Sequence, residues 1–155
     1  MVDAGASAGA PQIILAFDYG TRRIGVAAGD TLTRTARPLA TLRCAGAVPW
    51  ADIDRLVADY QPAQLVVGLP YNMDGTPTDV TKASRRFAHD IKRRYGLPVA
   101  LVDERLSSRE AAEQLRDARA RGLKRRRTTH GDIDKVAARI LLERWFDEPG
   151  AAQRV

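Results

Sequence analysis

The sequence predicts a layered α/β domain in which a mixed central sheet of about five strands is flanked by helices. Two apolar runs, at residues 13–18 and 24–30, are separated by a short polar turn and predict a β-hairpin. Further apolar runs, at residues 65–70 and 99–102, alternate with segments of helical periodicity. The length of 155 residues corresponds to one domain with a core of ordinary size.

The composition is that of an ordinary globular protein. We expect a single domain at residues 12–148, between a disordered N-terminal tail at 1–11 and a C-terminal tail at 149–155. No apolar stretch approaches the roughly 20 residues that span a bilayer, and the N-terminus lacks the features of a signal peptide. The single Cys44 cannot form an internal disulfide, which fits a reducing compartment. We therefore expect a cytoplasmic protein with no membrane or disulfide-linked partner; a homo-oligomer is compatible with the sequence but not indicated by it.

The first half of the chain continues the strand and helix pattern. Residues 36–43 predict a third strand, and Pro38, which has no N–H to donate, places it at an edge or at the start of a strand. Pro49 suits the first turn of a helix whose apolar positions recur until Gln61 and Pro62 end it.

Three more helices follow. Thr78 or Asp79 caps a helix that Gly96 ends; one of its faces is apolar and the other is basic. Ser107 and Glu110 have the capping-box spacing and predict the start of another helix. The last helix is expected at about residues 131–146.

Acidic residues lie at the ends of these elements. Asp18 ends the first strand, Asp103 and Glu104 follow the run at 99–102, and Asp132 and Asp134 lie in the first turn of the last helix. An aspartate such as Asp18 also caps turns, but several converging carboxylates favour a functional role. Because nothing else in the sequence suits a transition metal, these oxygens fit hard divalent cations, with Mg²⁺ as the first candidate. A pair of such ions can polarise a phosphodiester and generate the attacking hydroxide.

The last helix separates its two acids. On a helix that advances about 100° per residue, Asp134 lies one turn before Ala137 and Ala138, at the edge of the apolar stripe that faces the sheet. We expect only Asp134 to face the other acids, whereas Asp132 stabilises the start of the helix.

The positive charge is concentrated in one segment. Residues 116–127 contain seven Lys and Arg against one Asp, a local charge of +6 that equals the net charge of the whole chain. Such a segment suits a polyanion such as nucleic acid, and a solvated loop is the alternative.

Four motifs together resemble the YqgF family. They are the segments 16–27 (AFDYGTRRIGVA), 67–70 (VGLP) with the Asp74-Gly75 turn, 103–108 (DERLSS) and 134–141 (DKVAARIL). They occur in the order of the family and span nearly the whole chain after the N-terminal tail.

The resemblance implies an RNase H-like fold, related to the RuvC Holliday-junction resolvases, and a metal-dependent nuclease that uses Mg²⁺, with Mn²⁺ as a substitute. Its catalytic and metal-binding residues would be Asp18, Glu104 and Asp134. Asp103 remains an alternative to Glu104, because strand alternation sends the two to opposite faces. Nucleic acid would be contacted by Arg22, Arg23, Arg105, Lys124, Arg125, Arg126 and Arg127. Arg23 and Arg105 alternatively pair with the neighbouring acids.

Several functions are compatible with this resemblance. Processing of the 5′ end of pre-16S rRNA, as part of ribosome biogenesis, is the first, and resolution of Holliday junctions in DNA recombination is the alternative. A third is a non-catalytic nucleic-acid-binding module that uses its acids structurally. The segment 18–21 also resembles the first phosphate loop of actin-like ATPases, but those proteins enclose a nucleotide between two such domains, and this chain has room for one.

Overall fold

A computed structural model describes residues 10–72, 74–103 and 130–155 of the chain. The predicted helix after Ser107 and the basic segment at 116–127 lie outside these residues. Within them, one mixed sheet has the strand order β3-β2-β1-β4-β5-β6. Its strands are β1 (Ile13–Asp18), β2 (Arg23–Asp30), β3 (Thr35–Arg43), β4 (Gln64–Leu69), β5 (Val99–Asp103) and β6 (Gln153–Arg154).

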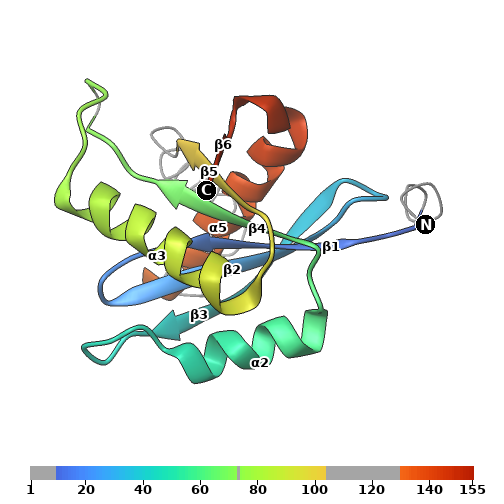
Figure 1. Cartoon of the computed structure of the whole chain (residues 1–155), viewed down its shortest axis with the longest axis horizontal. Coiled ribbons are helices and arrows are strands. Elements are labelled where there is room, and N and C mark those ends of the chain that lie inside the picture. Colours follow the sequence, from blue (N-terminus) through green and yellow to red (C-terminus); the bar gives the residue numbers. More distant parts are fainter. Residues whose placement is uncertain (1–9, 73, 104–129) are drawn as a thin grey trace, which may run out of the picture.

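Helices cover both faces of this sheet (Figure 1). α2 (Trp50–Tyr60) and α3 (Asp79–Tyr95) pack on one face, where Ile53, Phe87 and Ile91 join the inward residues of the strands in one apolar cluster. α5 (His130–Asp147) packs on the other face through a second cluster that includes Leu141 and Leu142. The predicted layered α/β architecture is confirmed. No helix in the described ranges combines the length and apolar character that crossing a bilayer requires.

The strand pairing confirms the hairpin and places the expected edge. β1 and β2 are antiparallel, whereas β1, β4 and β5 are parallel. β3 lies at the edge of the sheet, and its pairing with β2 is irregular beside Pro38, between Val26 and Ala27. β5, formed by the apolar run at 99–102, is not adjacent to β1, because β4 lies between the two.

The segment expected as a C-terminal tail adds to the fold. Pro149–Ala151 form a short 3₁₀ helix, η1, and Gln153–Arg154 form β6, which pairs antiparallel with β5. A strand of two residues is too short to produce a hydrophobic period, which is why the sequence pattern does not predict it.

α3 begins and ends at the residues that its sequence predicts. The Thr78 hydroxyl accepts a hydrogen bond from the Thr81 N–H at 3.1 Å, and the Thr81 hydroxyl accepts one from the Thr78 N–H at 2.9 Å. Gly96 ends the helix with a left-handed φ of 66°. These caps satisfy backbone groups that a helix end leaves without partners.

α5 lies close to the sheet because the residues of β2 that face it are small. Gly25, Ala27 and Gly29 alternate along this face of the strand. A Cβ on Gly29 would lie 2.8 Å from side-chain atoms of Leu142 and Phe146, whereas one on Gly25 would overlap the backbone carbonyl of Asp134. Side chains can rotate away from such an overlap, but the backbone of a packed helix cannot.

A polar network joins α2 to α3 on the opposite face. Arg94 donates two hydrogen bonds to the Asp54 carboxylate, at 2.8 and 2.7 Å, and the Tyr95 hydroxyl donates a third at 2.5 Å. Chiefly because of the bonds from Arg94 and then Tyr95, the pKa of Asp54 falls to about 2. The Arg94 guanidinium also lies over the Trp50 ring, 4.8 Å from its centroid.

We expect Gly25→Ala to lower the free energy of unfolding by about 2 kcal/mol, within the range for overpacked cores, because α5 must shift. Gly29→Ala, which meets only side chains, is the matched control and should cost less. Urea unfolding of both variants measures the difference. Equal costs would show that the contact of Gly25 with the α5 backbone is not a special constraint.

We also expect Asp54→Asn to lower the melting temperature at pH 7. An unfolded aspartate has a pKa of about 3.9, so the lowered folded-state pKa stabilises the protein above that pH and this stability is lost as the pH falls towards 2. The difference from wild type should therefore shrink below about pH 4. Asp59→Asn, on the exposed side of α2, is the control. A difference that stayed constant between pH 7 and pH 2 would exclude this carboxylate as its source.

Candidate active site

Asp18 is the last residue of β1, a central strand, and lies at one end of the sheet. The carboxyl ends of the parallel strands β1, β4 and β5 lie together at this end of the sheet. Along β1, Ile14 and Ala16 belong to the cluster on the α5 side, and strand alternation puts Asp18 on the same face. Asp18 is partly buried there.

Asp134 reaches the same position from α5. Gly25 is the partner of Asp18 in the β1–β2 register, with Cα atoms about 5 Å apart in such pairs. On its α5 face, Gly25 lies directly against the backbone and Cβ of Asp134. Asp18 and Asp134, 116 residues apart in the chain by their numbers, thus flank the same glycine. The structure brings these two predicted residues together.

Arg23 forms an ion pair with one of these carboxylates. Its Nε donates a hydrogen bond to Oδ2 of Asp134 at 2.8 Å, and the two side chains are 36% and 23% exposed. Arg23 is the first residue of β2, so the turn after Asp18 delivers both the acid and the cation to one site. Of the two roles considered for Arg23, this structure contains the pairing with an acid. The adjacent Arg22 is exposed.

The alternation along β5 separates Asp103 from this site. Val99 and Leu101 belong to the cluster under α2 and α3, whereas Ala100 and Val102 belong to the cluster under α5. Asp103, two residues after Leu101, therefore lies on the α2 and α3 face. Glu104 lies outside the described residues, as do Arg105 and the basic residues Lys124, Arg125, Arg126 and Arg127.

The chemistry of the described part of the site suits a hard cation. Asp18 and Asp134 offer carboxylate oxygens, which are the ligands that Mg²⁺ prefers, and Gly25 between them has no side chain to fill the space. Two carboxylates are fewer than a complete site, and no cluster of three potential ligand side chains occurs among the described residues. The third predicted ligand, Glu104, follows the last described residue of β5.

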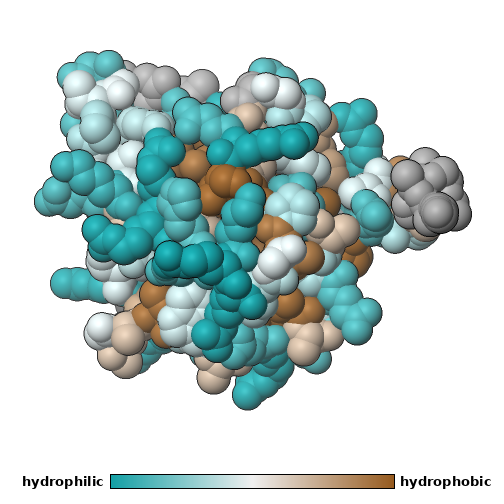
Figure 2. Space-filling view, viewed as in Figure 1, coloured by the Kyte–Doolittle hydropathy of each residue, from teal (hydrophilic) through white to brown (hydrophobic). Residues whose placement is uncertain are grey.

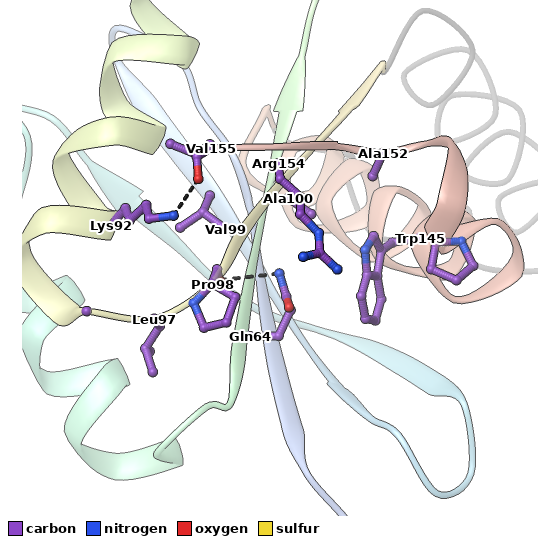
Figure 3. Close-up of a pocket in the computed structure, with 12 residues that line it drawn as sticks. Gln64, Lys92, Leu97, Pro98, Val99, Ala100, Trp145, Ala152, Arg154 and Val155 are labelled. Atoms are coloured by element: carbon purple, nitrogen blue, oxygen red, sulfur yellow. Dashed lines mark hydrogen bonds between the residues drawn. The ribbon is translucent and has the colours of Figure 1, made fainter. Parts of the chain in front are cut away.

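A cavity at the opposite end of the sheet is lined by different kinds of residue. It measures about 560 Å³ and lies between the start of β5, β6 and the end of α5 (Figure 3). Lys92 donates a hydrogen bond to the Val155 carbonyl there, and Gln64 donates one to the Pro98 carbonyl at 3.3 Å. Among the residues that the structure describes, its lining includes Arg154 and Trp145 but no carboxylate side chain. The described part of this lining therefore offers no carboxylate oxygens for a divalent metal ion.

Gly25 is the functional residue that reading the sequence for charged groups misses. It bears no reactive group, yet the approach of Asp134 to Asp18 depends on its missing side chain. A signal for it is present: a glycine inside a strand pattern often marks a close approach of another backbone.

Two curated proteins are similar to this chain over most of its length. A protein of Chromobacterium violaceum named "Putative pre-16S rRNA nuclease" is 48% identical over 139 residues, which cover 89% of this chain and 99% of the relative. A protein of Azotobacter vinelandii with the same name is 44% identical over 140 residues, covering 89% and 95% of the two chains.

Solved structures with little sequence identity share the fold. RuvC of Thermus thermophilus in complex with a Holliday junction substrate superposes with a TM-score of 0.56 at 15% identity, covering 93% of this chain and 99% of that one. The yeast mitochondrial Holliday junction resolvase Ydc2 has a TM-score of 0.51 at 10% identity, covering 86% and 77%. The predicted RNase H-like fold is therefore confirmed.

A sequence model of the RuvX family, described as "Holliday junction resolvase", matches residues 12–148, which include Asp18, Gly25 and Asp134. The chain belongs to the RuvX family, the YqgF family that its motifs resemble.

Proposed function

We propose that this protein is a metal-dependent nuclease that acts on structured nucleic acid, with the 5′ end of pre-16S rRNA as its main substrate. The observation that carries the proposal is the meeting of Asp18 and Asp134 on either side of Gly25. The relatives named for pre-16S rRNA support the choice of substrate. The same proposal places the protein in the cytoplasm.

Asp18, Asp134 and Glu104 would hold Mg²⁺, or Mn²⁺ in its place. When bound, two such ions supply polarisation of the phosphodiester and activation of water. Glu104 is preferred to Asp103 because Asp103 lies on the opposite face of the sheet, so continued strand alternation would direct the next side chain towards α5.

The cations of this chain would hold the substrate's phosphates at that site. Arg23 already lies beside Asp134, and its guanidinium would bind a phosphate of the substrate at this position. Arg22, Arg105 and the segment Lys124, Arg125, Arg126 and Arg127 would extend the contact with the backbone.

Resolution of Holliday junctions is the second candidate function. The family description and the structural likeness to a RuvC–junction complex favour it. Both functions use the same acids and differ in the nucleic acid that is bound.

The test of the proposal is a cleavage assay with Mg²⁺ or Mn²⁺ on a 5′-extended 16S rRNA precursor and on a four-way DNA junction. We expect cleavage of the RNA, and a loss of about 100-fold or more in Asp18→Asn and Asp134→Asn, because metal polarisation contributes several kcal/mol to the transition state. Asp132→Asn is the matched control on the same helix turn and should retain activity.

Each contrary outcome has a definite meaning. Cleavage of the junction alone would replace the main function by the second. An active Asp134→Asn protein beside an inactive Asp132→Asn protein would show that the ligand was assigned to the wrong residue. Binding without cleavage by either metal would leave the non-catalytic module.

Arg23→Gln tests whether the ion pair competes with metal. We expect less Mg²⁺ to be needed for half-maximal activity, because Asp134 loses its partner, while kcat/KM falls about tenfold through the lost charge-assisted contact with phosphate. Metal titrations of activity, with Arg23→Lys as the charge-conserving control, measure both effects. An unchanged Mg²⁺ requirement would rule out competition between Arg23 and the metal.

A further inference from the structure

α3 carries a concentration of positive charge that the candidate site does not use. Its 17 residues include six Lys and Arg against two Asp, which makes +4 for this helix in a chain of net charge +6. Phe87, Ala88 and Ile91 bury its other side against the sheet. Figure 2 shows hydrophilic side chains gathered over α3 on the face that the view presents.

Four of these side chains form one exposed row, which we call the α3 stripe. Lys82, Arg86, His89 and Arg93 are spaced four, three and four residues apart and are all exposed. Such spacing places them on one face of a helix, over a length of about 16 Å. They line a shallow hollow of about 630 Å³ together with Tyr71.

Structural contacts account for the other cations of α3 but not for all of the stripe. Arg94 is bound to Asp54, and Arg85 donates a hydrogen bond to the Tyr71 hydroxyl at 3.2 Å. Within the stripe, Arg93 pairs with Asp90 at 2.6 Å. By contrast, Lys82 and Arg86 form no ion pair with any residue that the structure describes, so their charges face solvent.

The stripe begins near the end of the sheet that carries Asp18. α3 follows the loop from the carboxyl end of β4, and Tyr71 in that loop contacts Arg85. Tyr19, the residue after Asp18, packs against Phe87 with ring centroids 5.0 Å apart. A strand of nucleic acid that leaves the site at Asp18 can therefore pass over this end of the sheet and reach Lys82 and Arg86 first.

We propose that the α3 stripe binds the phosphate backbone of the substrate strand beyond the cleavage position, as a second contact surface on the opposite face of the sheet. This inference rests on the proposed nuclease function and extends it. Lys and Arg side chains that contact phosphates bind nucleic acid independently of sequence. At about 16 Å, the stripe is long enough to contact at least two successive phosphates of one strand.

The test compares Lys82→Gln/Arg86→Gln with Arg37→Gln/Arg55→Gln in the full chain. The control removes the same charge from exposed positions on β3 and α2. Binding is measured in EDTA by fluorescence anisotropy over a range of salt, with an RNA that ends near the cleavage position and one extended by about ten nucleotides. Cleavage of both RNAs with Mg²⁺ is measured separately.

We expect the stripe variant to bind the extended RNA at least fivefold more weakly, with a larger loss than for the short RNA. Its slope of log affinity against log salt should fall by about 1.4, since each phosphate contact on a single strand contributes about 0.7. Equal losses in the control variant, or an unchanged slope, would overturn the proposal. The proposal would also be overturned if the stripe variant kept its affinity for RNA but lost binding of polyglutamate, measured in the same way. That result would assign the stripe to an acidic protein partner.

The two proposals fail in different ways. A wild-type protein that binds the extended RNA through the stripe but cleaves neither RNA would refute the nuclease function and retain the stripe as a binding surface. A protein that cleaves both RNAs equally in the wild type and the stripe variant, with equal affinities, would refute the stripe and retain the nuclease.

Discussion

The rest of the structure depends on how closely α5 packs against β2. Because Gly25 and Gly29 present no side chains on that face, the backbone of the helix can approach the sheet, and Leu141 and Leu142 fill the space further along. The contact fixes the start of α5 against the end of the hairpin. Packing thereby holds Asp134, from the C-terminal part of the chain, against the glycine that pairs with Asp18 of the first strand.

Much of this arrangement can be predicted from local sequence. The hairpin, the caps of α3 and the edge position of β3 follow from short patterns around Gly20, Thr78 and Pro38. Strand order does not, because it depends on long-range pairing: β4 lies between β1 and β5 although nothing in the individual runs indicates it. β6 could not be predicted for a local reason, because two residues are too few to show a hydrophobic period.

The candidate site was predictable in its residue types but not in its contacts. Asp18 and Asp134 stand out as carboxylates at the ends of elements, and the helical position of Asp134 already distinguishes it from Asp132. The pairing of Arg23 with Asp134 requires the register of two distant segments, which a single sequence does not contain. The face of Asp103 likewise needed the packing on both sides of β5 before it could be separated from the site.

The edges of the sheet also affect how the protein behaves at high concentration. An exposed edge strand can pair with a strand of another molecule, which leads to aggregation. On β3, Pro38 lacks an N–H and the register is irregular beside it, so the ladder that a foreign strand would follow is interrupted. At the other edge, β6 contains only two residues. Both edges of the sheet are therefore poor templates for pairing with a strand of another molecule.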